Sequence, residues 1–183
     1  MDKIITKRLI LRKFNHLDYI KMYENWASDV SVAEKAGWPV HRDIEKTRQL
    51  VESWISEYDD IHTFNWIITL RDNNEPIGSI SVVTKDIKNK VCEIGYNIGV
   101  NWWNHGYVTE AISEVVKYLF ETGLFEVISA SCFEDNDASR RVLEKNCFVY
   151  EGTLRKRVIQ NNKRVSLLQF SILKEEYLRL SSK

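Results

Sequence analysis

The sequence has few of the features that mark nucleic-acid-binding, membrane or secreted proteins. Its 26 lysines and arginines are balanced by 26 aspartates and glutamates, so it lacks the basic excess of a dedicated nucleic-acid binder. No apolar run approaches the roughly 18 residues of a membrane span. The first residues, MDKIITKRLILRKF, contain no continuous apolar block of the kind found in a secretory signal. We therefore expect neither a nucleic-acid partner nor a membrane partner.

Cysteine, proline and glycine are also scarce. The three cysteines, Cys92, Cys132 and Cys147, are odd in number, and their spacing matches neither a zinc site nor a disulfide framework. No metal site is expected, and a cytoplasmic location is the simplest interpretation. Two prolines and seven glycines leave no low-complexity linker. The 183 residues are therefore expected to form a single domain over residues 1–183, as a monomer or a homodimer.

The spacing of apolar residues predicts the order of helices and strands. Residues 8–14, 63–70, 76–84, 91–100 and 127–133 have the pattern of strands. Residues 16–27, 42–58, 108–122 and 136–146 have the period of helices. The segment between the first two helices carries a Gly-Trp-Pro break and is expected to be partly loop. The last part, from residue 148, reads as two long strands around Gln-Asn-Asn.

This order predicts the fold class. Antiparallel hairpins followed by a β-α-β crossover form a mixed, mostly antiparallel central sheet with helices on both faces. The chain is therefore expected to be an α+β protein.

The stretch VNWWNHGYVTEA (100–111) lies directly before the third predicted helix. Its two tryptophans could belong to the core of an ordinary strand-to-helix turn. They could instead form one wall of a phosphate site, because the first N–H groups of a helix have no partner within it. Gly95 and Gly99, in the preceding strand, are either tolerated there or mark a bulge or a close backbone approach.

Three stretches resemble the GNAT superfamily of acetyl-CoA-dependent N-acetyltransferases, and within it the RimJ/RimL-type branch of ribosomal-protein N-terminal acetyltransferases. They are EIGYNIGVNWWNHGYVTEA (93–111), NDASRRVLEKNCFVYEGTLR (136–155) and LLQFSILKEEY (167–177), the last resembling the closing strand. The superfamily loop Gln/Arg-x-x-Gly-x-Gly/Ala falls on residues 103–108, where only Gly106 matches. Asparagine tolerates a positive φ, so the turn is expected to survive at Asn104, where many members have glycine. Cys147 replaces the glycine of the second signature.

The resemblance implies acetyl-CoA as cosubstrate and assigns its binding residues. The pyrophosphate would lie on the backbone N–H groups at the start of the helix, and the pantetheine arm would bind the backbone of the preceding strand. The implied cofactor-binding residues are Ile98, Val100, Asn104, His105, Gly106, Tyr107, Val108, Thr109 and Asn136.

The resemblance also implies two catalytic residues, each with a simpler alternative. Ser139 would protonate or hydrogen-bond the leaving thiolate, because Leu143 stands where many members have a tyrosine acid. Asn136 and Ser139 could instead form only a helix N-cap and first turn. Glu93 would take the proton of the amine, or it could be a salt-bridged carboxylate. Glu34 and Glu45 are weaker candidates for this base.

The activity implied is transfer of an acetyl group to a primary amine, by direct attack in a ternary complex without a covalent enzyme intermediate. The branch implies a protein N-terminus as acceptor; a small-molecule amine, or a non-catalytic CoA-binding module, is the alternative. The five basic residues of the last hairpin could attract an acidic peptide or the 3′-phosphate of CoA, or be merely solvated. They are Arg155, Lys156, Arg157, Lys163 and Arg164. A nucleotide-dependent oxidoreductase is disfavoured, since no Gly-x-Gly-x-x-Gly follows an early strand.

Overall fold

A computed structural model describes residues 1–181, which form two compact units. The N-terminal unit comprises Met1–Ser81 and Tyr96–Ala111, and the C-terminal unit comprises Val82–Gly95 and the described residues from Ile112 onward. Strands β4 (Pro76–Asp86) and β5 (Val91–Ile98) and helix α4 (Tyr107–Glu121) each begin in one unit and end in the other. The single domain expected from the chain length stays a prediction.

The strands of the N-terminal unit are antiparallel neighbours in chain order. Strand β1 (Ile4–Ile5) pairs with β2 (Leu9–Arg12), β2 pairs with β3 (Asn65–Leu70), and β3 pairs with β4. The predicted strands at 8–14, 63–70 and 76–84 are confirmed. Leu9 and Leu11 are both fully buried in alternate positions of β2, which is the pattern of a strand with one covered face. Strand β1 has only two residues, too few for a sequence pattern to reveal it.

Helices of this unit pack around a shared apolar cluster. They are α1 (Asp18–Met22), continued by a π-helical turn at Tyr23–Ala27, α2 (Val30–Ala36) and α3 (Ile44–Ser56), which a 3-10 turn at Glu57–Asp59 follows. The cluster joins Trp26 and Val51 from these helices to Ile67 of β3. The predicted helices at 16–27 and 42–58 are confirmed. The segment between them, expected to be partly loop, contains α2.

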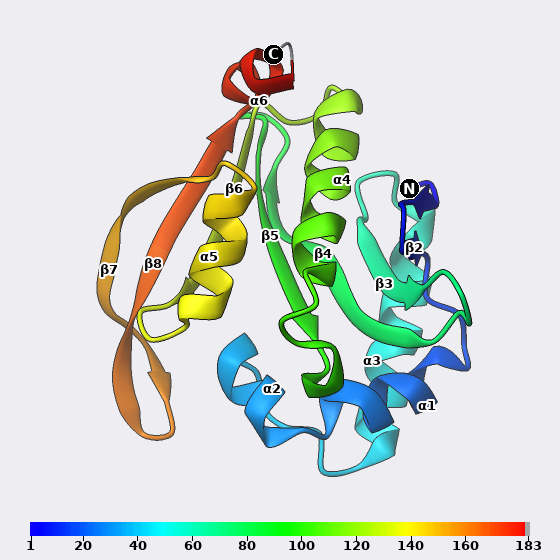
Figure 1. Ribbon diagram of the computed structural model, residues 1–183. Coiled ribbons are helices and arrows are strands. Elements are labelled where there is room, and N and C mark those ends of the chain that lie inside the picture. Colours follow the sequence, from blue (N-terminus) through cyan, green and yellow to red (C-terminus); the bar gives the residue numbers. More distant parts are fainter. Residues whose placement is uncertain (182–183) are drawn as a thin grey trace. The chain divides into compact units, whose positions relative to one another are not determined.

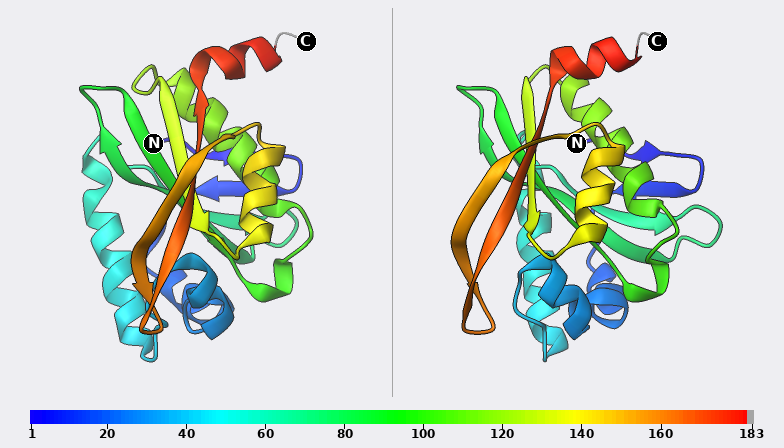
Figure 2. Two further views of the ribbon diagram at one scale, coloured as in Figure 1. Left: turned by 90° about the vertical axis from the view of Figure 1, so that its left-hand side faces the viewer. Right: turned by 60° about the vertical axis from the view of Figure 1, so that its left-hand side comes forward.

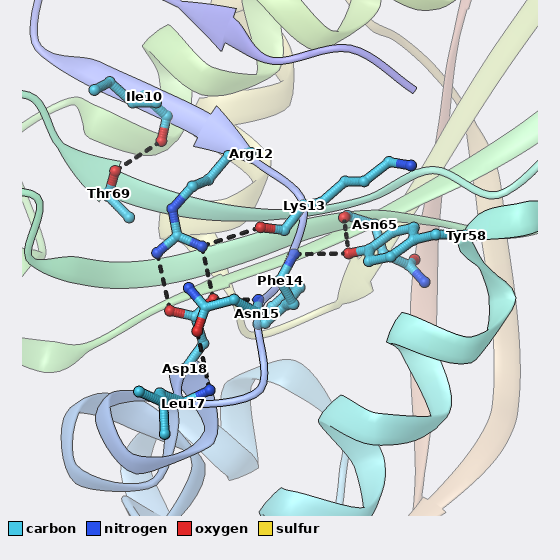
Figure 3. A network of polar contacts seen from close by, with 10 residues as sticks. All are labelled: Ile10, Arg12, Lys13, Phe14, Asn15, Leu17, Asp18, Tyr58, Asn65 and Thr69. Carbon is cyan, nitrogen blue, oxygen red and sulfur yellow. Dashed lines mark hydrogen bonds and ion pairs between the residues drawn. The ribbon is translucent and has the colours of Figure 1, made fainter.

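A polar network fixes the connection from β2 to α1 (Figure 3). The Arg12 guanidinium donates to both carboxylate oxygens of Asp18, at 2.6 and 2.9 Å, and the Asn15 N–H donates to the same carboxylate at 2.7 Å. The Tyr58 hydroxyl accepts from the Phe14 N–H at 2.9 Å, and burial raises the pKa of Tyr58 to about 12. These contacts hold the start of α1 against β2 and the end of α3.

In the C-terminal unit the strands follow the order β5-β6-β8-β7. Strand β6 (Val127–Phe133) is parallel to β5, whereas β8 (Lys163–Leu173) is antiparallel to both β6 and β7 (Val149–Gln160). Strands β7 and β8 form one long hairpin, visible from three directions in Figures 1 and 2. Helix α5 (Asp137–Lys145) lies between β6 and β7 in the chain, and α6 (Lys174–Ser181) directly follows β8.

The predicted α+β class with a mixed, mostly antiparallel sheet is confirmed. Of the strand pairings described for residues 1–181, β5–β6 alone is parallel, and the chain between these strands includes α4 as the expected crossover helix. The predicted strand 91–100 ends earlier, at Ile98, and a 3-10 turn at Val100–Trp102 follows it. The two long strands predicted from residue 148 are confirmed as β7 and β8. The stretch 167–177, which resembles the closing strand of the family, also contains the start of α6 after Leu173.

No helix within residues 1–181 is both long enough and apolar enough to cross a membrane.

Candidate functional site

Two residues of the loop before α4 have left-handed backbone conformations. Asn104 has φ +62° and Gly106 has φ +77°. Asn104 therefore adopts the positive φ that asparagine was expected to tolerate. Turns that include left-handed residues can direct successive N–H groups to one side and form an anion-binding concavity. The loop has the backbone conformation that such a site requires.

Helix α4 starts at Tyr107, directly after this loop. The Glu110 N–H donates to the Gly106 carbonyl at 3.1 Å, and this bond opens the ladder of the helix. The N–H groups of residues 107–109 precede that bond and belong to the first turn, where a helix leaves its donors unpaired internally. The Val108 side chain is 91% buried (9% exposed), so it packs inward and does not obstruct the exposed side of the loop. The helix start therefore fits an anionic group.

The two tryptophans before the loop are only partly buried, which disfavours the core alternative. Trp102 is half-buried, and Trp103 is 36% exposed. The Trp103 indole N–H donates to the Ile98 carbonyl at 2.9 Å, and its backbone N–H donates to the Val100 carbonyl at 3.2 Å. Trp103 thus folds the loop back onto the end of β5. Each carbonyl oxygen keeps a second lone pair for a ligand.

The end of β5 lies against other backbone segments. A Cβ at Gly99 would be 2.3 Å from the Asn25 carbonyl oxygen of the π-helical turn, so only glycine fits there. Close approach of another backbone, one of the alternatives for a strand glycine, is confirmed at this position. At Gly95 an added Cβ would meet the Val83 side chain at 2.9 Å.

Asn97, next to these glycines, has an incompletely paired amide. Its Nδ2 donates to the Ser79 Oγ at 2.9 Å, whereas its Oδ1 is buried without a partner in the part of the chain that the structure describes. Such an oxygen costs about 1–3 kcal/mol unless a donor reaches it. A bound molecule with an N–H group would supply that donor beside Ile98.

Helix α5 begins at the second predicted constellation. The Asn136 side-chain oxygen accepts from the Ser139 N–H at 3.2 Å, so the N-cap interpretation of Asn136 is confirmed. The Ser139 hydroxyl hydrogen-bonds the Cys132 sulfur, and burial raises the pKa of the Cys132 thiol. Leu143 is fully buried. Ser139 therefore has a half-buried hydroxyl that lies in hydrogen-bond contact with a sulfur atom.

Glu93 lies in β5, where hydroxyl groups hold its carboxylate. The Ser131 hydroxyl of β6 donates to it at 2.9 Å, and the Thr84 hydroxyl lies 3.5 Å from its other oxygen. Glu45, a weaker base candidate, forms an ion pair with Arg48, whose hydrogen bonds lower the Glu45 pKa. Glu45 is thus a poor proton acceptor, and Glu93 stays the candidate base.

The basic hairpin is exposed. Its turn at Asn161 and Asn162 has φ values of +48° and +59°, as expected around Gln-Asn-Asn. The Lys156 ammonium donates to the Arg164 carbonyl at 3.3 Å, and the Arg164 guanidinium donates to the Lys156 carbonyl at 3.2 Å. All five basic side chains of the hairpin are solvent-exposed, which agrees with a solvated surface.

Cys147 follows α5 with φ +62°, in the left-handed region where its counterpart in the signature is glycine. A side chain in this conformation destabilises the folded state by about 1–2 kcal/mol. Glycine removes this strain, but its more flexible unfolded chain lowers the free energy of unfolding by about 0.4–1 kcal/mol. Cys147→Gly is expected to raise the free energy of unfolding by about 0.5–1 kcal/mol in urea denaturation. Cys147→Ser, which keeps a Cβ, is the control. Equal stability of the two variants would contradict this explanation.

Contacts around the loop include residues that the sequence did not single out. Arg8, Thr6 and Glu110 form a polar cluster beside Gly106, and Cys132 contacts Ser139. Arg8 and Glu110 are about a hundred positions apart, so no local pattern could pair them.

Comparison with known proteins identifies a family and several relatives. The sequence model of a family described as acetyltransferase (GNAT) domain matches residues 8–149. An uncharacterized N-acetyltransferase of Bacillus subtilis, YoaA, is 33% identical over 169 residues, which cover 92% of this chain and 95% of that protein. A ribosomal-protein-serine acetyltransferase of Escherichia coli is 25% identical over 130 residues, 70% of this chain and 72% of that protein.

One solved structure has the same fold over nearly the whole chain. It is RimL, described as a ribosomal L7/L12 alpha-N-protein acetyltransferase in complex with coenzyme A. The TM-score is 0.87 at 20% sequence identity, and the match covers 96% of this chain and 99% of RimL.

Proposed function

Since the chain belongs to the GNAT acetyltransferase family, we propose that it transfers an acetyl group from acetyl-CoA to a protein N-terminal amine in the cytoplasm. The observation that carries the cofactor half of this proposal is the loop at Asn104 and Gly106, which opens onto the start of α4. The acceptor half is supported by relatives described as ribosomal-protein or alpha-N-protein acetyltransferases.

In this proposal the N-terminal unit binds the cosubstrate, which supplies an activated acetyl thioester. The N–H groups of residues 104–109 bind the pyrophosphate. Hydrogen bonds to charged groups contribute about 1.5–3 kcal/mol each, so a few backbone donors suffice. Backbone groups of Ile98 and Val100 bind the pantetheine amides, and Asn136 is proposed to add a further bond. The loop departures are compatible with this role because backbone donors do not depend on the side chains at Trp103 and Asn104.

Two side chains, Glu93 and Ser139, are proposed to move protons. A protonated amine cannot attack a thioester, so Glu93 accepts its proton, directly or through water. The Ser131 hydroxyl orients the Glu93 carboxylate for this task. As the amine nitrogen bonds to the acetyl carbon, the carbon–sulfur bond breaks. Ser139 then turns its O–H from the Cys132 sulfur to the departing thiolate, which it stabilises by a hydrogen bond or protonates, taking up a replacement proton from water.

The proposal is tested with a set of short peptides that share one sequence. One peptide has a free N-terminus and no lysine, a second has a formylated N-terminus, and small primary amines form a third set. Mass spectrometry should find one added acetyl group on the α-amine of the first peptide and none on the second. Transfer to small amines alone would overturn the acceptor assignment. Cosubstrate binding without transfer to any amine would instead indicate a non-catalytic CoA-binding module.

A further inference from the structure

Arg8, immediately before β2, spans the loop between Trp103 and α4 with its guanidinium group. Its Nη1 donates to the His105 carbonyl at 2.8 Å, and its carbon centre lies 4.5 Å from the centre of the Tyr107 ring. A Cβ at Gly106 would lie 3.6 Å from its Nη2. One side chain therefore touches three consecutive loop residues, His105, Gly106 and Tyr107.

Glu110, one turn into α4, fixes Arg8 in this position. The Arg8 Nε and backbone N–H donate to its two carboxylate oxygens at 2.7 and 2.8 Å, and the Thr6 hydroxyl donates at 2.5 Å. Burial opposes ionisation of Glu110, but the hydrogen bonds from Thr6 and Arg8 outweigh it and lower the Glu110 pKa. Glu110 thus stays charged at neutral pH and ties the loop, the start of α4 and β2 into one polar cluster.

The geometry of a peptide unit links this cluster to the loop donors. In a planar trans peptide the carbonyl and the following N–H point in opposite directions. Because Arg8 holds the His105 carbonyl, the Gly106 N–H must point away from Arg8. The His105 ring repeats this arrangement two peptides earlier, since its Nδ1 lies 2.7 Å from the Trp103 carbonyl oxygen. The Asn104 N–H is then directed away from the His105 ring.

We infer that Arg8 is a positioning residue that, with Glu110, fixes the loop of residues 103–107 so that its N–H groups face the pyrophosphate of acetyl-CoA. This inference rests on the proposed cofactor site. The loop has a tryptophan where the superfamily has glutamine or arginine, and Arg8 supplies a cationic anchor from outside the loop. The Arg8 side chain is 41% exposed in its ion pair with Glu110, so the pair adds little to the stability of the fold. The main effect of Arg8 is therefore on the geometry of the loop.

The inference is tested by acetyl-CoA affinity, measured by isothermal titration calorimetry on the full chain. Arg8→Met and Arg8→Lys should both weaken binding by about 10- to 100-fold, the loss of one charge-assisted hydrogen bond or two. Lysine keeps the charge but cannot bond His105 and Glu110 in the same forked geometry. The kcat at saturating acetyl-CoA should stay within about twofold, because a positioning residue for binding alters KM alone. Arg71→Met is the matched control, since Arg71 donates at 3.3 Å to the Thr6 carbonyl and should leave affinity unchanged.

Glu110→Gln separates positioning from direct contact with a phosphate. If Arg8 acts by holding the loop, this variant weakens acetyl-CoA binding by about tenfold, because a charge-assisted bond to Arg8 is lost. If Arg8 binds phosphate directly, removal of the competing carboxylate tightens binding and Arg8→Lys keeps most of the affinity. That pair of results would overturn the inference.

Gly106→Glu, measured in parallel, separates failure of the inference from failure of the proposed site. Loss of binding in Gly106→Glu with full affinity in Arg8→Met would overturn the role of Arg8 alone. Full affinity in both variants would place the pyrophosphate elsewhere and overturn both proposals.

Discussion

Gly106→Glu is expected to abolish acetyl-CoA binding, with a loss of at least about 100-fold in affinity. The backbone at Gly106 has φ +77°, and any side chain there is strained. The added Cβ would lie 3.6 Å from the Arg8 Nη2, and the added carboxylate would bring a negative charge close to a pyrophosphate held on the neighbouring N–H groups. Two like charges about 4 Å apart repel by about 4 kcal/mol at a protein surface, well over the 2.8 kcal/mol or so of a 100-fold change.

The control for this variant is Gly123→Glu. Gly123 has φ +73° and no atom within 4 Å of an added Cβ, so the substitution brings similar backbone strain and the same charge at the other end of α4. Calorimetry should show a similar loss of stability in both variants and a loss of acetyl-CoA binding in Gly106→Glu alone. Undiminished binding in Gly106→Glu would remove the loop from the cofactor site.

Ser139→Ala is expected to lower kcat by about 10- to 100-fold with little change in acetyl-CoA affinity. A hydrogen bond to a charged group such as a thiolate contributes about 1.5–3 kcal/mol, which corresponds to this range of rates. Helix α5 should keep its N-cap, because Asn136 accepts from the backbone N–H of Ser139 and not from its hydroxyl.

Steady-state kinetics with the best amine acceptor measures this effect. Ser129→Ala is a suitable control, since the Ser129 hydroxyl donates at 3.1 Å to the Cys92 carbonyl and has no proposed role in the reaction. An unchanged kcat in Ser139→Ala would exclude Ser139 from the mechanism. A large loss of acetyl-CoA affinity would assign it to binding instead.

Local features of the site could be predicted from the sequence because their causes are local. Asparagine at position 104 tolerates the left-handed turn, and the spacing of Asn136 and Ser139 forms an N-cap. The signature has glycine at position 147, and the positive φ of Cys147 explains why. The structure was needed to show this φ angle.

Features that depend on distant parts of the chain could not be predicted in this way. The bond from Ser131 to Glu93 requires the register of the parallel pair β5–β6, which no turn or loop length specifies. The cluster of Arg8 and Glu110 likewise depends on how β2 meets α4. Helix α2 is a different case. Its N-cap signal at Asp29 is local, but the nearby Gly-Trp-Pro sequence made a loop the stronger expectation.

The most direct test of the proposed cofactor site is whether the loop binds the cosubstrate, although Trp103, Asn104 and Val108 depart from the superfamily pattern. Thermal unfolding of the unmodified protein with acetyl-CoA, CoA or NADH measures this. A ligand at 100 times its Kd adds about 2.7 kcal/mol, which for a chain of this size raises the Tm by about 5–10 °C. We expect this rise with acetyl-CoA and with CoA, and no rise with NADH. An unchanged Tm with both acetyl-CoA and CoA would contradict the proposed cofactor site.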